Sequence, residues 1–466
     1  MKTSMKITNA IRLLIIPIIG FLSILSGAFI CPLNRFISGL IIILAGLILY
    51  FLMVFRVVEK NWLDIRAVFT GVWLVTIGLA AFRLTNYQEP WLTKTWVLLA
   101  IAYLMFQIGA LCGISQGGKV FSFLQKVFYR LKPKRIQCTL SENKLFPICV
   151  VITLIGIVCF VINALIKGYI PAFSNVRTAY VDFYTKFHLF AVGATAVSGL
   201  CYYCIKTQPI SKMKKAILWG CIFYLIILFP TLVVSRGVFI IAALSFSTVF
   251  FYLNKRKLSA FIICLVVMMS MYLITSSLRG YSDAELDNLF DPSEIVLDDD
   301  ENGGEGGFSF SLPPKAAFLY GYLTVSHDNF NEAVENTKGY TWGVRQLAPF
   351  NVILRMPWIN ETIENGEFYM VRPYLTTVNM VGLFYYDFHA FGVAICTLLW
   401  AILVGIVQGV YEKAKGPFSL FILGFAMNVV ALSFFSSWVD AFELWMFCGV
   451  IFIVAVIASV KIKRKE

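Results

Sequence analysis

Charged side chains are scarce in this chain, and their scarcity decides the class of protein. Only 14% of the 466 residues are charged, whereas 59% are hydrophobic and 16% are aromatic. A water-soluble domain cannot bury so much apolar surface, so the composition excludes an ordinary globular protein. The apolar residues come in runs of about 20, the length of helix that crosses the hydrocarbon core of a bilayer. The sequence therefore predicts an all-α polytopic membrane protein.

Twelve apolar runs of this kind predict twelve transmembrane helices. They cover residues 11–31, 36–55, 67–83, 95–114, 145–166, 187–205, 215–234, 237–253, 258–277, 389–410, 417–435 and 441–460. Nine spans therefore lie in residues 1–277 and three in residues 379–466, separated by one long segment, 278–378. No internal repeat of about 20–50 residues and no duplication of two halves is visible, which disfavours the common transporter folds.

The formal charge of +13 is unevenly divided among the connections between the spans. If the connections are assigned alternately to two sides, one side holds both termini and 26 Lys and Arg, and the other holds 13. Short basic connections face the cytoplasm, so both termini are predicted to be cytoplasmic and segment 278–378 to lie outside. Orientation in the membrane thus explains the positive charge, and nucleic acid is not an expected partner.

Residues that bind metals are also few. The chain has three histidines, and none of its eleven cysteines lies in segment 278–378. Cys201 and Cys204 have a spacing that metal sites use, but no second pair accompanies them, so a packing role is favoured. Because no cluster of His and carboxylate residues is visible, neither a metal nor another cofactor is predicted.

The first part of the outer segment, residues 281–307, is acidic. Ten acidic residues and no basic residue lie between Asp283 and Glu305, a composition that predicts a mobile loop. The stretch that starts at Asp298 matches the first half of a calcium-binding loop. Its twelfth position is Ser309 instead of the required Glu, so calcium binding is not favoured.

The second part, residues 313–375, is predicted to be folded. It begins with a helix after Pro313, and it then interleaves aromatic and basic residues: Trp342, Arg345, Arg355, Trp358 and Arg372. Aromatic faces with polar groups between them suit sugar rings, because the ring stacks on C–H groups while the polar groups hold hydroxyls. Two interpretations stay open, a glycan-binding surface or a small folded cap whose aromatic residues form its core.

Arg236 is the single charged residue between Ala216 and Leu253. It either reaches the headgroups as a topological stop or faces a cavity that holds an anion. Predicted outer connections contain eight Arg and five Lys. A guanidinium binds phosphate by two parallel hydrogen bonds, so an outward set of arginines fits a pyrophosphate group.

Three short motifs resemble those of a known family. They are KGYIPAFSNVR at 167–177, SRG at 235–237 and TVNMVGLFYYDFHAFG at 377–392, in which His389 stands where the family usually has Gly. In their order and placement they are similar to the motifs of bacterial oligosaccharide repeat unit polymerases, the Wzy-type O-antigen polymerases. The number of spans and the long late outer segment agree with this resemblance.

The resemblance implies a GT-C-like glycosyltransferase in the bacterial cytoplasmic membrane, and the lack of a visible His and carboxylate cluster predicts that it is metal-independent. Such an enzyme joins undecaprenyl-pyrophosphate-linked repeat units on the outer face: a sugar hydroxyl attacks the anomeric carbon of the growing chain, and undecaprenyl pyrophosphate leaves. Its expected partners are this lipid-linked oligosaccharide, membrane lipid and, as an additional candidate, a chain-length regulator. The alternatives are an O-antigen ligase, which shares the donor, a flippase for the same lipid-linked oligosaccharide, and a non-enzymatic assembly partner.

The same resemblance, together with the charges, gives the candidate site residues. Substrate binding is expected from Arg177, Arg236, Arg279, Arg345, Arg355, Arg372, Trp342 and Trp358. The candidate catalytic residues are His327, Asp328 and Asp387, one of which would act as the base for the attacking hydroxyl. For His327 and Asp328 the competing interpretation is that they are solvated surface residues.

Overall fold

The computed structural model describes most of the chain. The described residues are 2–58, 60–131, 136–138, 142–174, 182–278, 295–296, 309–310, 312–351, 355–364, 368–372, 375–437 and 441–462. Two of the predicted substrate-binding residues, Arg177 and Arg279, lie outside these ranges, as does nearly all of the acidic tract 281–307.

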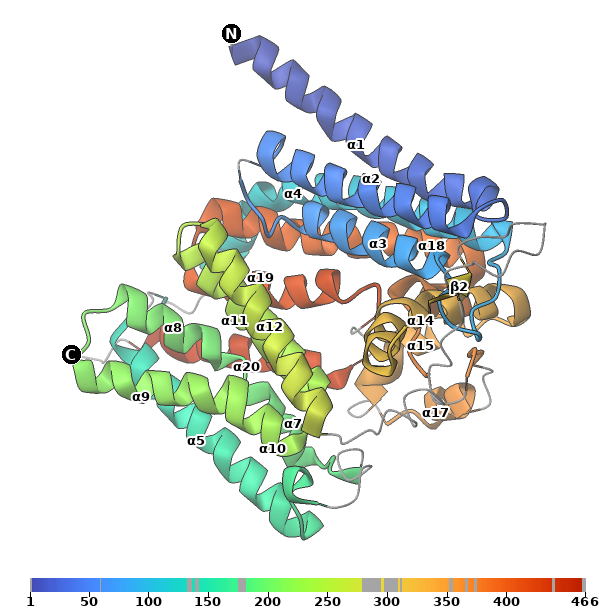
Figure 1. Ribbon diagram of the computed structural model, residues 1–466. Coiled ribbons are helices and arrows are strands. Elements are labelled where there is room, and N and C mark those ends of the chain that lie inside the picture. The colour runs from blue at the N-terminus through green and yellow to red at the C-terminus, as the bar shows by residue number, and fades with distance from the viewer. Residues whose placement is uncertain are drawn as a thin grey trace. The chain divides into compact units, whose positions relative to one another are not determined.

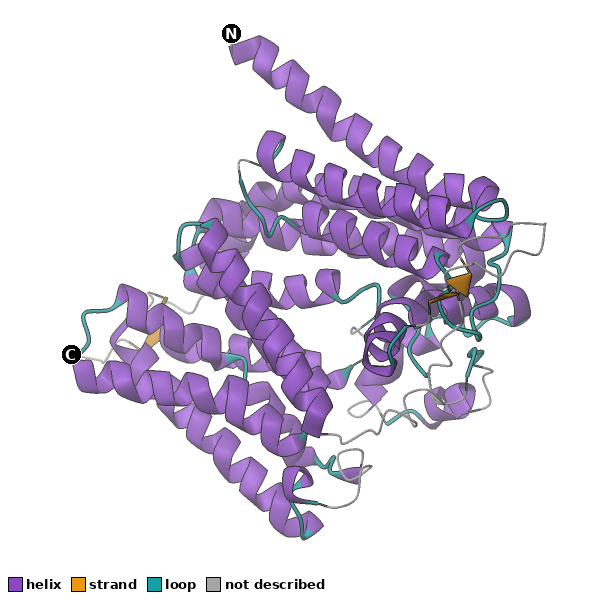
Figure 2. Ribbon diagram, viewed as in Figure 1, coloured by secondary structure: helices purple, strands orange, loops and turns teal. Residues whose placement is uncertain are grey.

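The described chain is almost entirely helical (Figures 1 and 2). Its α-helices are α1 (Lys2–Ile30), α2 (Arg35–Arg56), α3 (Ile65–Ala81), α4 (Thr93–Leu131), α5 (Glu142–Lys167), α7 (Lys186–Ala194), α8 (Val197–Thr207), α9 (Lys212–Phe223), α10 (Phe229–Val233), α11 (Arg236–Leu253), α12 (Leu258–Leu278), α14 (Pro314–Asn336), α15 (Val344–Leu347), α17 (Pro357–Glu364), α18 (Met380–Ala414), α19 (Pro417–Ala431) and α20 (Phe442–Ser459). A π-helix, η2 (Tyr224–Leu228), joins α9 to α10, and η1 (Pro171–Phe173) and η3 (Ala348–Phe350) are 3₁₀ turns.

Four short strands form two antiparallel pairs. Strand β1 (Ile136–Cys138) pairs with β4 (Val460–Ile462), and β2 (Ile295–Val296) pairs with β3 (Ser309–Phe310). The registers place Ile136 opposite Ile462 and Ile295 opposite Phe310. These pairs are too short to form a sheet with a core of its own.

The class predicted from the sequence, an all-α membrane protein, is confirmed. Seven helical segments in the described ranges are long and apolar enough to cross a membrane: Arg35–Arg56, Thr93–Val127, Lys144–Lys167, Lys186–Thr207, Lys212–Val233, Arg236–Leu253 and Met380–Ala414. The other five predicted runs fall on shorter apolar helices, Ile15–Ile30, Ile65–Ala81, Leu258–Ser270, Pro417–Ala431 and Phe442–Ala458. The count of twelve spans stays a prediction.

The chain forms two compact units that alternate along the sequence. The first unit comprises Met1–Leu111, Tyr281–Leu403 and Val430–Asp440, and the second comprises Cys112–Gly280, Val404–Val429 and Ala441–Glu466. In the first unit, α2 and α3 lie side by side (Figure 1), and α14 packs against α3. A Cβ at Gly39 would meet the carbonyl oxygen of Gly78, and the reverse also holds, so both glycines are needed for this close approach.

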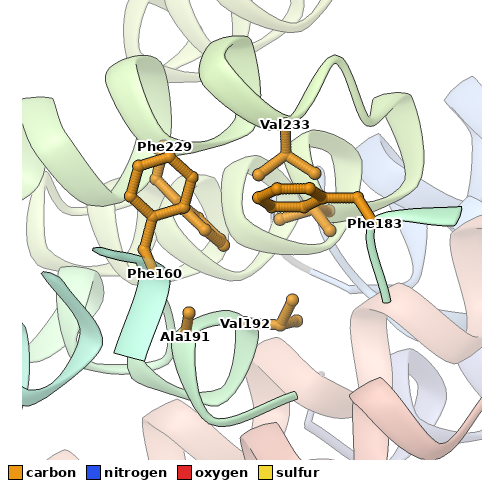
Figure 3. Packing of buried hydrophobic residues seen from close by; sticks show 7 residues of the cluster. Phe160, Phe183, Ala191, Val192, Phe229 and Val233 are labelled. Carbon is orange, nitrogen blue, oxygen red and sulfur yellow. The ribbon is translucent and has the colours of Figure 1, made fainter. Parts of the chain in front are cut away.

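The second unit contains an apolar cluster (Figure 3), which includes Val233 before the break between α10 and α11 and Val238 after it. Phe160 of α5 meets Phe229 edge to face, with ring centroids 5.7 Å apart, and Phe183 and Val233 complete the contact. The break follows from local geometry. Val234 has a left-handed backbone (φ 55°) that ends α10, and the Ser235 hydroxyl accepts a hydrogen bond from Val238 N and caps α11.

Candidate functional site

The candidate site in the first unit is built around a kink in α18. The backbone leaves helical geometry at Phe388 (φ −144°, ψ 18°) and His389 (φ 49°, ψ −140°), and it becomes helical again beyond them. At this bend a Cβ on Gly392 would collide with the carbonyl oxygen of Phe384, so only glycine fits there. The kink separates a short buried stretch, which starts at Met380, from the longer apolar helix that follows.

The turn 339–345 wraps around the last residues before the kink. Thr341 N donates to the carbonyl oxygen of Tyr386 (3.1 Å), and Trp342 N donates to that of Asp387 (3.3 Å). The Asp387 carboxylate is 0% exposed, and its Oδ1 accepts from Thr341 Oγ1 (2.5 Å) and from Arg345 N (3.3 Å). No hydrogen bond of good geometry reaches its Oδ2 within the described ranges, but the Gln346 side chain and the Gly343 backbone also interact with the carboxylate. Asp387 therefore holds the turn through Oδ1, and Oδ2 is the oxygen better placed to accept a proton.

Four rings form a continuous row from the interior to the surface. Tyr385 is buried and stacks on His389 (4.9 Å), His389 stacks on Tyr340 (4.2 Å), and Tyr340 contacts Trp342 (5.2 Å). At the outer end Tyr340 is 49% exposed and Trp342 is 72% exposed. The structure thus presents two aromatic rings to solvent beside the buried carboxylate.

The predicted tryptophans are surface residues. Trp342 is mostly exposed, and Trp358 in α17 is 47% exposed. The interpretation of segment 313–375 as a cap with aromatic residues in its core is therefore wrong for both tryptophans. Exposed tryptophans favour the binding interpretation, because burial of such a ring would otherwise stabilise the fold.

The arginines of the first unit differ in their surroundings. Arg345 is buried, and its Cζ lies 4.5 Å from the ring centroid of Tyr386 and 5.2 Å from that of Phe368. Burial lowers the pKa of Arg345, and Tyr386 and Asp387 oppose this shift, so the guanidinium keeps its charge. Arg355 is exposed and has a positive φ of 51°, whereas Arg372 is half-buried. Arg345 contacts Asp387 directly, because its backbone N donates to Asp387 Oδ1.

His327 and Asp328 in α14 are fully buried, so the interpretation of these residues as solvated surface groups is wrong. They are 0% and 2% exposed. Because Asn379 Nδ2 donates to His327 Nδ1 (3.0 Å), His327 Nε2 carries the proton and donates to Thr76 Oγ1 (3.0 Å). These contacts hold α14 against α3. They favour a structural role for His327, and its catalytic role stays a prediction.

The Asp328 carboxylate is held by two donors. Gln88 Nε2 donates to Oδ2 (2.9 Å) and Trp91 Nε1 donates to Oδ1 (2.8 Å). Tyr320, two helical turns earlier in α14, donates to Gln88 Oε1 (2.8 Å) and completes the network. Since both oxygens are engaged, Asp328 is less suited than Asp387 to accept a proton from a substrate.

Sequence reasoning missed the residues that complete these two sites. A signal for the buried network was present: Tyr320, Thr324, His327, Asp328 and Asn331 recur at helical spacing, which places a polar stripe on one face of α14. No comparable sequence pattern predicts the row of rings. Tyr340 and His389 are 49 residues apart in the sequence, and they come into contact at the kink in α18.

The buried residues His327 and Asp328 should make the stability of the folded protein depend on pH. Burial lowers the pKa of His327 from 6.5 to about 3, so its contribution to stability falls as the pH falls below 6.5. Burial raises the pKa of Asp328 from 3.8 to about 7, against the hydrogen bonds from Trp91 and Gln88, so its contribution rises as the pH falls from about 7 to about 4. The two effects oppose each other, because the folded state keeps the proton on Asp328 and the unfolded state keeps it on His327.

Single substitutions should therefore reveal opposite slopes. The quantity compared is the unfolding temperature of each variant in detergent minus that of wild type. As the pH is lowered from about 6.5 to about 4.5, we expect this difference to increase for His327→Gln and to decrease for Asp328→Asn. Intrinsic tryptophan fluorescence during heating measures both. Equal slopes in the two variants would contradict this account of the pair.

A second polar position lies in the second unit, at the start of α11. Arg236 is the first residue of this 18-residue helix and is 5% exposed, and its neighbours Val233 and Val238 belong to the apolar cluster of Figure 3. Burial disfavours a side chain that extends to the headgroups, and a role of Arg236 in holding an anion stays a prediction. The N-terminus of a helix adds partial positive charge at the same place.

An apolar groove adjoins the same cluster. It has a volume of about 470 Å³ and is lined by Phe160, Val161, Ala164, Leu165, Gly168, Tyr169, Ile170 and Phe173. Gly168 has a positive φ of 78°, which turns the chain at the end of α5 and brings the 167–173 stretch back over the helix. The groove thus joins the GYIPAF stretch to Phe160, a residue of the cluster.

These features define an all-α membrane protein with an aromatic and acidic site beside a kinked apolar helix. Within the described ranges, no group of three or more His, Cys, Asp or Glu residues is placed to hold a metal ion. The chain matches no protein-family model, no curated protein and no solved structure.

Proposed function

We propose that this protein is a membrane glycosyltransferase that polymerises undecaprenyl-pyrophosphate-linked oligosaccharide repeat units on the outer face of the bacterial cytoplasmic membrane. One observation carries the proposal: two exposed rings, Tyr340 and Trp342, lie beside the buried carboxylate of Asp387 where apolar helix α18 is kinked. Aromatic faces suit sugar rings, and a carboxylate can accept the proton of an attacking hydroxyl. The resemblance of residues 377–392 to the polymerase motif supports the same assignment.

The reaction assigns a task to each part of the site. The acceptor hydroxyl oxygen forms a bond to the anomeric carbon, the bond from that carbon to the pyrophosphate oxygen breaks, and the carrier pyrophosphate leaves with the electron pair. Asp387 Oδ2 is the proposed proton acceptor, because Oδ1 already holds Thr341 and Arg345. Since Asp387 is fully buried, a local movement that leaves Tyr340 and Trp342 in place has to expose Oδ2 to the hydroxyl.

Positive charge is needed where the pyrophosphate leaves. In the second unit we assign this task to Arg236, at the N-terminus of α11, and the apolar groove beside Phe160 suits an isoprenoid chain. In the first unit, Arg345 is the buried cation beside the Asp387 turn. Arg177, Arg279, Arg355 and Arg372 remain further candidates for the substrate phosphates. The proposal includes a GT-C-like arrangement and cytoplasmic termini. It also includes twelve spans, a number that the seven long and five shorter apolar helices together support.

Deletion of the gene tests the function. We expect the surface glycan of the deletion strain to consist of single repeat units that still reach the outside, because transport across the membrane does not need the polymerase. Electrophoretic separation of the surface glycan by length measures this, and a plasmid copy of the wild-type gene should restore the ladder. Accumulation of the lipid-linked unit on the cytoplasmic side would indicate a flippase instead. Polymer that stays linked to undecaprenyl pyrophosphate instead of reaching its acceptor would indicate a ligase.

A further inference from the structure

His389 has a backbone conformation that a residue with a side chain rarely adopts. Its φ of 49° and ψ of −140° lie in a region that glycine reaches readily and that is unfavourable for any residue with a Cβ. Such strain persists only where surrounding contacts hold it, and it concentrates at functional sites.

The contacts of the His389 ring show what holds it there. The ring lies between Tyr385 (4.9 Å, interplanar angle 10°) and Tyr340 (4.2 Å, interplanar angle 25°). His389 Nε2 donates to the carbonyl oxygen of Gly339 (3.0 Å), so this nitrogen carries the proton. His389 thus connects α18 to the beginning of turn 339–345 by two kinds of contact.

The inner end of the row is fixed independently. The phenol oxygen of Tyr385 accepts a hydrogen bond from Lys94 Nζ (2.7 Å), and its hydroxyl donates to the carbonyl oxygen of Val334 (3.3 Å). Tyr385 is buried and connects helices α4, α14 and α18. A ring stacked on it therefore has a rigid support.

The turn itself needs such support. Trp342 has a φ of 51° and Gly343 has a φ of 85°, so two successive residues adopt left-handed backbone geometry, which is unfavourable for Trp342. Trp342 and Tyr340 are also the most exposed rings of the row, where solvent would otherwise leave them mobile. Four hydrogen bonds already tie the backbone and the Thr341 side chain of this turn to Tyr386 and Asp387, and His389 adds the contact that holds the Tyr340 ring itself.

We propose that His389 is a positioning residue that fixes Tyr340 and Trp342 as a binding platform for one sugar ring beside Asp387, and that the strained backbone is retained because the imidazole ring is needed there. The choice of a sugar as ligand rests on the proposed function. The role of His389 in ordering turn 339–345 is independent of that function.

Two substitutions separate the strain from the ring. His389→Gly removes both, whereas His389→Ala removes the ring and keeps the unfavourable φ. We expect the unfolding temperature of His389→Gly in detergent to exceed that of His389→Ala. In both variants, hydrogen exchange of the amides of 339–345 should be about tenfold faster than in wild type, because two ring contacts and a hydrogen bond are lost. His389→Phe, which keeps a ring, should restore part of the protection.

Binding is measured with the single-repeat oligosaccharide isolated from the deletion strain. We expect His389→Gly to raise the Michaelis constant for this acceptor about tenfold while the turnover number changes less, and to shorten the glycan ladder. Trp342→Ala is the matched control: it should weaken acceptor use to a similar degree but leave the exchange of residues 344–345 near that of wild type, because His389 still holds Tyr340.

The outcomes distinguish the positioning role of His389 from the proposed glycan-based function. Wild-type exchange rates in His389→Gly, or a lower unfolding temperature than in His389→Ala, would overturn the positioning role. Faster exchange in a protein whose wild type binds no oligosaccharide would support the role of His389 in the turn and reject the glycan-based function.

Discussion

Replacing Arg236 by alanine is expected to abolish the polymer while the protein still inserts in the membrane at its normal amount. Arg236 is buried at the first position of α11, where helix and guanidinium together offer positive charge to an anion. Loss of a charge-assisted contact to a leaving pyrophosphate costs roughly 2–4 kcal/mol of barrier, which corresponds to a rate about 30- to 1000-fold lower. The ladder of glycan lengths, normalised to the amount of membrane protein, measures the effect.

Two further variants define the reason for the loss. Arg236→Lys keeps the charge but not the planar fork that binds phosphate through two hydrogen bonds, so it should remain strongly impaired. Arg256→Ala is the matched control, because Arg256 belongs to the same unit, follows the other end of α11 and stacks on Tyr252 (5.0 Å). It should give a nearly normal ladder. Full-length polymer from the Lys variant would return Arg236 to the role of a topological marker.

Asp387→Asn is expected to lower the rate of polymerisation about 10²- to 10⁴-fold without loss of folded protein, the range that a general base contributes. Asparagine keeps Oδ1, which accepts from Thr341 Oγ1 and Arg345 N, so turn 339–345 should stay in place. Only the capacity of the second oxygen to take up a proton is lost. The measurement is the initial rate of polymer formation in membranes, with the unfolding temperature as the control for folding.

Asp328→Asn provides the comparison. Asp328 is also a buried carboxylate of the first unit, but Gln88 and Trp91 occupy both of its oxygens, so its substitution should lower stability more than the rate per folded molecule. A normal rate in Asp387→Asn would leave Asp387 with the structural role that its contacts to Thr341 and Arg345 show. A lost rate in Asp328→Asn at normal stability would transfer the assignment to α14.

The sequence alone determined the class of protein and the positions of its apolar helices. Hydrophobic runs of bilayer length are local features, and a helix satisfies its backbone hydrogen bonds within the same run, so each of the twelve runs falls on a helix. The start of α14 was equally local, because Pro313 and Pro314 fit the first turn of a helix and disfavour its interior. The motif at 377–392 also pointed to Asp387 before its surroundings were known.

Burial and the meeting of distant residues were decided only by tertiary structure. Asp328 is surrounded by Gln88 and Trp91, which precede it by 240 and 237 residues, and no local pattern reports such contacts. For the same reason His327 and Asp328 were interpreted as solvated surface residues, whereas α3 and the stretch that leads into α4 cover them. The place of Trp342 and the strained His389 between two tyrosines depends on the kink in α18, where a Cβ at Gly392 would collide with the carbonyl oxygen of Phe384. Hydrophobicity along the chain determines which segments are removed from water. Contacts between distant residues determine which polar side chains are buried with those segments.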